Sequence, residues 1–380
     1  MAAKAAAAPK SLVVFYGTNR RRHSDAFDAI SGEAPDNRRL WLGKAAVGMV
    51  GDPERTEARR RLLAHPEIPG DDDFADPDAG TAALLLDAWL DNALDRGAVA
   101  LFFIHGFANS FGSALERAAQ ITEFYSGHVA LAPFAFSWPS DGLVVDPQKL
   151  AALVGAAITQ YRSDQTDAIA AGGALSRLLR EVHRARLRAA KRKRLPRMVL
   201  MAHSMGNLAL SAGLAVMRNG LLTAKMADTF DQAVLVASDV PHIMLNPQEP
   251  LSEIALLANQ VSVVISRDST LSIASRIAND GSRRLGHFGP AELSLLPHNV
   301  TVVDYAMGLQ APQSKPELFQ VGGTEWDIVE HQYYRNDRRA RADLAAVLAG
   351  TAPAGRVVLA PADQVQSERA RHQILPFTGV

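Results

Sequence analysis

Runs of apolar residues alternate along this chain with longer segments in which apolar residues recur every three or four positions. Continuous apolar runs are typical of strands buried on both faces of a parallel sheet, and the longer spacing is typical of amphipathic helices. The clearest predicted strands are Ser11–Tyr16, Ala98–Ile104, Val129–Phe136, Met198–Met201, Gln232–Ala237, Val261–Ser266 and Asn299–Asp304. Their alternation with helical segments predicts an α/β fold with a mostly parallel central sheet, helices on both faces and a small helical cap.

The predicted domain spans residues 11–349. An alanine-rich leader, residues 1–10, precedes it and is expected to be disordered. Residues 350–380, with scattered proline and glycine, are expected to form a loosely attached tail. Two segments, about 140–195 and 241–260, are expected to be cap or insertion elements at the carboxyl ends of the strands.

Composition narrows the class of protein. The 380 residues include 40 Lys and Arg against 40 Asp and Glu, so the formal net charge is zero and no nucleic-acid partner is expected. There is no cysteine, which excludes disulfides, thiolate metal ligands and a cysteine nucleophile. No window approaches the ~20 apolar residues of a membrane span, so we expect a soluble, cytoplasmic protein.

The segment 177–197 is heavily basic, with Glu181 as its only acidic residue. A basic run of this kind can bind nucleic acid or anionic lipid. Leu175, Leu178 and Val182 supply an apolar stripe beneath it, which favours a helix with a solvated charged face.

The segment Met198–Asn207 carries the strongest chemical signal. Four apolar residues predict a buried strand, and Ala-His-Ser-Met-Gly follows at once, ahead of a predicted helix. A serine between small residues at a sharp strand-to-helix turn is the nucleophile-elbow pattern, with Ala202 at the position where glycine is commoner. The sequence therefore predicts Ser204 as a nucleophile.

A serine nucleophile requires a histidine base, and that base requires an orienting acid. Among the later histidines, His331 is favoured because it follows the last predicted strand, where a loop can fold back over Ser204. His287 lies in a long loop, and His298 precedes a strand and so belongs at the opposite end of the sheet.

Three aspartates end strands after the elbow and could orient the histidine. Asp268 follows the second strand after Ser204, Asp239 follows the first, and Asp304 ends the last. Asp268 is preferred, Asp239 is its main rival, and the spacing alone does not separate them. Asp268 also fits the start of a helix.

The oxyanion of an acyl-transfer reaction requires two N–H donors. We expect these to be the backbone groups of Met205, directly after the nucleophile, and of Phe107, in the loop after the strand that ends at His105-Gly106. No cluster with metal-ligand spacing and no glycine-rich nucleotide loop appears in the sequence, so no metal or other cofactor is expected.

Several of these motifs together resemble the bacterial α/β-hydrolase family of unknown function (domain of unknown function 900). They are Tyr16-Gly-Thr-Asn-Arg20, Phe103-Ile-His-Gly-Phe-Ala-Asn-Ser110, Phe136-Ser-Trp-Pro-Ser-Asp-Gly142, Met201–Asn207, Ser266-Arg-Asp-Ser-Thr-Leu271, Arg284-Leu-Gly286 and His331-Gln-Tyr-Tyr334. The resemblance implies an α/β-hydrolase fold with a triad of Ser204, Asp268 and His331, but no substrate.

The expected activity is that of a serine esterase acting on a small-molecule carboxylic ester through an acyl-enzyme on Ser204. Esters are favoured by analogy with other hydrolases of this fold. A thioesterase, lactonase or amidase with the same triad remains an alternative, as does a non-catalytic binding module. The sequence does not determine the oligomeric state.

Overall fold

The computed structural model describes residues 11–23, 26–27, 40–50, 59–62, 80–140, 150–220, 223–266, 268, 271, 275–306, 318–321, 324–327, 331–359 and 371–374. The leader at 1–10 and most of residues 51–80 lie outside these residues.

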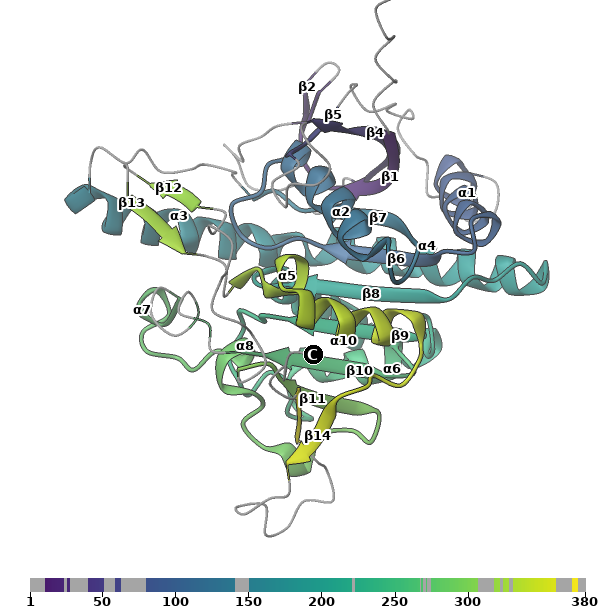
Figure 1. The fold of residues 1–380 in the computed structure, drawn as a ribbon. Coiled ribbons are helices and arrows are strands. Elements are labelled where there is room, and N and C mark those ends of the chain that lie inside the picture. Colours follow the sequence, from purple (N-terminus) through teal and green to yellow (C-terminus); the bar gives the residue numbers. More distant parts are fainter. Residues whose placement is uncertain are drawn as a thin grey trace, which may run out of the picture.

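Within the described residues, eleven strands form one sheet in the order β14–β15–β11–β10–β9–β8–β6–β7–β1–β4–β5 (Figure 1). In the order of the sheet, every pair of neighbours between β15 and β1 is parallel. The outer strands β14, β4 and β5 pair in antiparallel fashion. The strands are β1 (Ser11–Thr18), β4 (Trp41–Val50), β5 (Arg59–Leu62), β6 (Val99–Ile104), β7 (Leu131–Ser137), β8 (Met198–His203), β9 (Gln232–Val236), β10 (Val261–Ile265), β11 (Val300–Asp304), β14 (Arg356–Leu359) and β15 (Arg371–Ile374). The predicted mostly parallel sheet is confirmed.

Helices cover both faces of this sheet. They are α1 (Thr81–Asp95), α2 (Phe111–Tyr125), α3 (Leu150–Ala170), α4 (Gly172–Lys191), α5 (Gly206–Asn219), α6 (Ile254–Leu257), α7 (Arg276–Ala278), α8 (Leu285–Phe288), α9 (Tyr333–Asn336) and α10 (Arg338–Ala349). Two short hairpins lie outside the sheet, β2 (Arg22–His23) with β3 (Ala26–Phe27) and β12 (Leu318–Val321) with β13 (Thr324–Asp327).

The two cores follow from the alternation of side chains along the strands. Phe102 and Ile104 of β6 pack in one core with α1, α4 and α5, whereas Leu101 and Phe103 pack in the other with α2 and α10. Because both faces of β6 are covered, every residue of this strand is buried and apolar, as the sequence pattern indicated.

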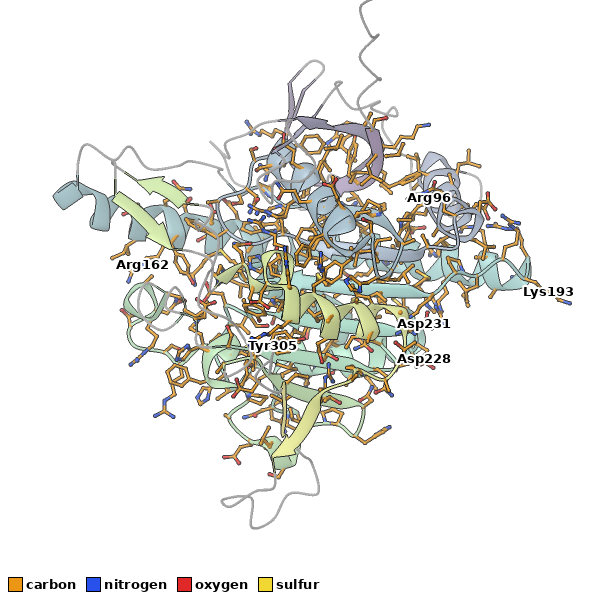
Figure 2. The ribbon with its side chains drawn as sticks, viewed as in Figure 1. Arg96, Arg162, Lys193, Asp228, Asp231 and Tyr305 are labelled. Carbon is orange, nitrogen blue, oxygen red and sulfur yellow. The ribbon has the colours of Figure 1, made fainter. Side chains whose placement is uncertain are left out.

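The two ends of the sheet are distinct. The helices α3 and α7 lie at the end where β8 points into α5, and α3 continues past the strands (Figure 1). Figure 2 shows Arg162 of α3 at this end, and Lys193 and Asp231, which precede β8 and β9, at the opposite end. The carboxyl ends of the strands therefore face α3 and α7.

The first segment predicted as a cap divides into two helices with different surroundings. Whereas α3 extends past the strand ends, α4 lies on the sheet, because Leu175, Leu178 and Val182 are buried in the core that it shares with α1 and α5. The second segment, 241–260, holds only a 3₁₀ turn at Pro250–Glu253 and α6.

The basic run on α4 faces acidic residues. Three arginines pair across to α1 in the contacts Arg188–Asp87 (3.1 Å), Arg192–Asp87 (2.8 Å) and Arg194–Asp95 (2.5 Å). A fourth, Arg186, pairs with Asp231 at 3.1 Å. These pairs, together with the buried apolar stripe, support the interpretation of this segment as a solvated helix face.

Two strands occupy the predicted tail. β15 pairs in parallel with β11, and β14 pairs with β15 at the sheet edge. The sequence pattern ended the strands at Asp304 because four-residue runs that include charged and polar residues are too short to identify as edge strands. Among the helices of the described residues, none is both long and apolar enough to cross a bilayer.

Candidate active site

Ser204 lies at the turn between β8 and α5, which is the predicted strand-to-helix context. Its φ angle is +53°, in the left-handed region that a residue with a side chain occupies at a cost of ~1–2 kcal/mol. Backbone hydrogen bonds hold it there: its N–H donates to Val236 O (3.0 Å), and its carbonyl accepts from the N–H groups of Asn207 (3.0 Å) and Asp239 (3.2 Å).

Two glycines allow this turn to approach the loop after β6. A Cβ on Gly206 would lie 2.5 Å from the carbonyl oxygen of His105 and 2.6 Å from that of Ile104. A Cβ on Gly106 would lie 2.8 Å from the Cβ of Ser204. The loop that was expected to supply an oxyanion donor therefore contacts the serine directly.

His331 and Asp268 are joined by a hydrogen bond between His331 Nδ1 and Asp268 Oδ2, 2.5 Å long, and both side chains are buried. The other carboxylate oxygen of Asp268 accepts from the N–H of Leu271. His331 also packs beside His203, the residue before Ser204, with their rings 4.8 Å apart. The structure thus brings the preferred acid and the preferred base together next to the elbow.

The charge state of His331 depends on Asp268. Burial by itself would lower the pKa of this imidazole, but the charge and hydrogen bond of Asp268 raise the pKa above its ordinary value, with a smaller contribution from the charge of Asp239. An imidazole with a raised pKa is a stronger base, and its Nδ1 proton is held by the carboxylate.

Asp239, the rival acid, is engaged elsewhere. Its Oδ1 accepts from Arg284 Nε (2.7 Å) and Ser275 Oγ (2.5 Å), and its Oδ2 accepts from the Tyr161 hydroxyl (2.5 Å). Arg284 is itself buried, so the two side chains form an ion pair inside the protein. Asp239 therefore neutralises Arg284 and ties α3 to the end of β9.

The other candidates have different surroundings. His287 Nδ1 accepts from the backbone N–H of Asp268 at 3.1 Å, so it contacts the backbone of the preferred acid. His298 is exposed just before β11, at the amino ends of the strands. Asp304 accepts from the N–H of Ala306.

The two expected oxyanion donors have no protein acceptor among the described residues. In the described part of the chain, neither the N–H of Met205 nor that of Phe107 donates to a backbone or side-chain atom. Phe107 lies three residues after the end of β6, in the loop that Gly106 brings against Ser204, and its ring centroid lies 5.6 Å from that of Tyr161. Both donors are free for a ligand.

Sequence reasoning missed several residues around the site. Arg284 and Tyr161 had no recognisable signal beyond the Arg-Leu-Gly motif, because their role depends on Asp239, which is 45 and 78 positions away. Asn109 lies beside Ser110, which caps α2 by accepting from the N–H of Ser113, but its own side chain donates to the carbonyls of Gly106 and Phe107.

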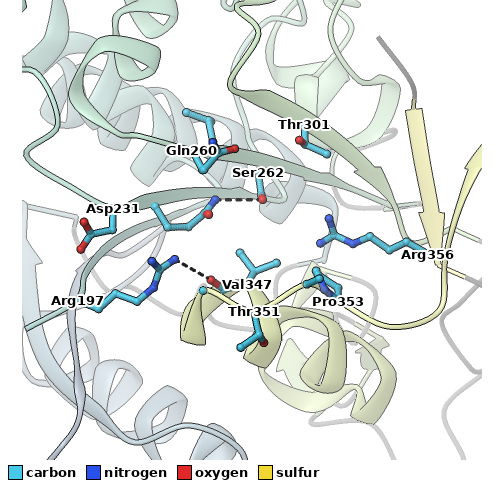
Figure 3. A pocket seen from close by; sticks show the side chains of 13 residues that line it. Arg197, Asp231, Gln260, Ser262, Thr301, Val347, Thr351, Pro353 and Arg356 are labelled. Atoms are coloured by element: carbon cyan, nitrogen blue, oxygen red, sulfur yellow. Dashed lines mark hydrogen bonds between the residues drawn. The ribbon is translucent and has the colours of Figure 1, made fainter.

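A cavity of about 300 Å³ lies at the opposite end of the sheet (Figure 3). Its lining includes Arg197, Asp231, Gln260 and Thr301, at the amino ends of β8 to β11, and Arg356 of the antiparallel strand β14. A strand of six residues such as β8 spans ~20 Å, so this cavity is remote from Ser204. Within the described ranges, no group of three or more His, Cys, Asp or Glu side chains is placed to hold a metal ion.

Comparison with known families is consistent with this geometry. A family model described as "Alpha/beta hydrolase of unknown function (DUF900)" matches residues 85–311, which is more than half of the chain. The matched segment contains Ser204 and Asp268 and ends before His331. A comparison with curated proteins gives no match.

Proposed function

This chain belongs to the family of α/β-hydrolases of unknown function, and from that premise we propose that it is a serine hydrolase that cleaves a carboxylic ester through an acyl-enzyme on Ser204. The observation that carries the proposal is the 2.5 Å bond between His331 Nδ1 and Asp268 Oδ2, formed beside a serine held at φ +53°. Burying a carboxylate and an imidazole next to a strained turn is costly, and a serine triad requires this combination.

In the first half-reaction, the free Nε2 of His331 accepts the Ser204 hydroxyl proton while Oγ attacks the ester carbonyl carbon. The carbonyl oxygen becomes an oxyanion that the N–H groups of Phe107 and Met205 stabilise. His331 then donates the proton to the departing alkoxide oxygen, which leaves as the alcohol, and Ser204 carries the acyl group.

In the second half-reaction, water takes the place of the alcohol. His331 accepts a proton from water as its oxygen attacks the acyl carbon, and a second tetrahedral oxyanion forms at the same two donors. Collapse of this intermediate releases the carboxylic acid, and His331 returns its proton to Ser204 Oγ. Asp268 holds the Nδ1 proton throughout and stabilises the imidazolium.

The test is treatment with a fluorophosphonate probe followed by peptide mapping, together with turnover of p-nitrophenyl esters of several chain lengths. We expect labelling at Ser204 and measurable ester hydrolysis. Ser204→Ala should abolish both, with the free energy of unfolding within ~1 kcal/mol of wild type, because the side chain is small and lies at the turn after β8, outside the two hydrophobic cores. An equally active Ser204→Ala protein would end the proposal.

The same assay separates the remaining alternatives. Turnover of thioesters, lactones or amides in preference to esters would reassign the substrate class while keeping the triad. Absence of labelling in folded protein would favour a non-catalytic binding module. We also propose a cytoplasmic location, which cell fractionation would test.

A further inference from the structure

The peptide group between Gly106 and Phe107 is held from its carbonyl side by two side chains. The carbonyl oxygen of Gly106 lies 2.8 Å from His105 Nδ1 and accepts from Asn109 Nδ2 at 3.0 Å. We propose that His105 and Asn109 are positioning residues that aim and polarise the Phe107 N–H as an oxyanion donor. This inference rests on the function proposed above.

Planarity of the peptide group carries the effect from one side to the other. Because the Gly106 C=O and the Phe107 N–H belong to one rigid trans unit, fixing the direction of the carbonyl fixes the direction of the N–H. Asn109 Nδ2 also donates to the Phe107 carbonyl at 2.9 Å, so one amide holds both peptide groups that flank Phe107. The N–H between them cannot turn away without breaking these bonds.

Polarisation adds to orientation. Each hydrogen bond accepted by a carbonyl draws electron density toward its oxygen and makes the N–H of the same peptide a stronger donor. The Phe107 N–H has no acceptor within the described part of the chain, so this strengthened donor is available to a ligand.

His105 is in the protonation state that this role requires. Burial, followed by the charge of Arg20, lowers the pKa of His105 to about 3, so the ring is neutral at physiological pH. A neutral imidazole that faces a carbonyl oxygen with Nδ1 carries its single proton there. The Trp138 ring stacks on the His105 ring, with centroids 5.0 Å apart. The other ring nitrogen of His105, Nε2, has no hydrogen-bond partner in the described structure.

Asn109 is in turn fixed by two buried residues that follow the neighbouring strands β1 and β7. Its N–H donates to Ser140 Oγ (3.0 Å), and its carbonyl accepts from Arg20 Nη2 (2.7 Å). The same Arg20 guanidinium donates to the carbonyls of Trp138 (2.6 Å) and Ser140 (3.0 Å). This buried arginine, which belongs to the Gly-Thr-Asn-Arg motif at the end of β1, therefore holds the loop after β6 against the segment after β7.

The experiment compares wild type with Asn109→Asp, in which a carboxylate of similar shape cannot donate to the Gly106 carbonyl. Removing a whole oxyanion donor costs about 10²–10³ in kcat, so we expect a loss of ~10–100-fold for a misaligned donor, with KM for a p-nitrophenyl ester within about twofold. The inhibition constant of a trifluoromethyl ketone, which forms the oxyanion on Ser204, should rise by the same factor as kcat/KM falls.

Asn299→Asp is the matched control. Asn299 is also buried and also donates through Nδ2 to two backbone carbonyls, those of Ala255 (2.8 Å) and Ala258 (3.0 Å), but it precedes β11 at the far end of the sheet. It should lose stability without a change in kcat or in inhibitor affinity.

Two further variants keep the test decisive if Asn109→Asp does not fold. Asn109→Ala removes the donor without a buried charge, and His105→Phe keeps a ring against Trp138 while removing the other donor. Unchanged kcat and inhibitor affinity in the folded variants would overturn the inference. Failure of the wild type to react with a fluorophosphonate would instead overturn the proposed function, so the two failures are distinguishable.

Discussion

The side chain of His203 reaches the backbone of His331: its Nε2 lies 3.2 Å from the His331 carbonyl oxygen. Burial, and then the charge of His331, lower the pKa of His203 well below its ordinary value, so a neutral ring donates through Nε2. The Tyr334 ring packs against it at 4.6 Å. The residue before the nucleophile therefore fixes the segment that carries the proposed base.

Replacing His203 by Phe should lower kcat by up to ~100-fold, because a small displacement of a catalytic group is costly, and should destabilise the protein by ~1–3 kcal/mol through the unsatisfied His331 carbonyl. Ester turnover and urea unfolding measure the two effects. His183→Phe is the control. His183 lies on α4, and its replacement also removes one hydrogen bond, the one between its side chain and Thr229. Equal kcat in His203→Phe and wild type would contradict the positioning role.

The two rival acids should respond differently to substitution by Asn. Asp268→Asn should lower kcat by ~10³–10⁴-fold, because an amide no longer holds the tautomer in which His331 Nε2 is free. Asp239→Asn leaves the Arg284 cation buried without its partner, so its main effect should be a loss of ~3–5 kcal/mol in unfolding free energy. Activity per folded molecule separates these effects, and a larger kcat loss in Asp239→Asn would reverse the assignment.

The pH dependence of ester turnover should report the raised pKa of His331. The base must be neutral to accept the Ser204 proton, so kcat/KM should rise with pH and reach half its plateau above 6.5, the ordinary histidine pKa. Asp239→Asn should move this midpoint downward, because the charge of Asp239 contributes to the raised pKa. A wild-type midpoint at or below 6.5 would contradict the coupling to Asp268.

Folding stability should also rise with pH on the acid side of 6.5. His105 and His203 have lowered pKa values in the folded protein, so their contribution is present above 6.5 and is lost as pH falls, by ~1.4 kcal/mol per pH unit for each histidine. The contribution of His331, whose pKa is raised, is complete below 6.5 and is lost only as pH rises. Urea unfolding between pH 4.5 and 6.5 should therefore show a shallower slope in His105→Phe and His203→Phe than in wild type, and equal slopes would refute this.

The parts of the site that depend on local sequence could be predicted, and those that depend on side-chain direction could not. Ser204 and Phe107 follow directly from a strand and its adjoining turn. Asp239 and Asp268 follow the neighbouring strands β9 and β10, and their roles are separated by side-chain contacts, of Asp239 with Arg284 and of Asp268 with His331. The same reasoning explains the fold, in which the buried strands were evident and the short edge strands β14 and β15 were not.

Gly206→Ala tests the approach of the elbow to β6. Its new Cβ would lie 2.5 Å from the His105 carbonyl oxygen and 2.6 Å from that of Ile104, and backbone atoms cannot move aside as a flexible side chain would. We expect a loss of ~1–3 kcal/mol in unfolding free energy, and a fall in kcat because the displaced loop carries Phe107. Gly112→Ala is the matched control, because Gly112 is also in the first turn of a helix and nothing lies within 4 Å of its added Cβ. This substitution should raise the free energy of unfolding by ~0.4–1 kcal/mol. Wild-type stability and turnover in Gly206→Ala would show that the elbow does not depend on this close approach.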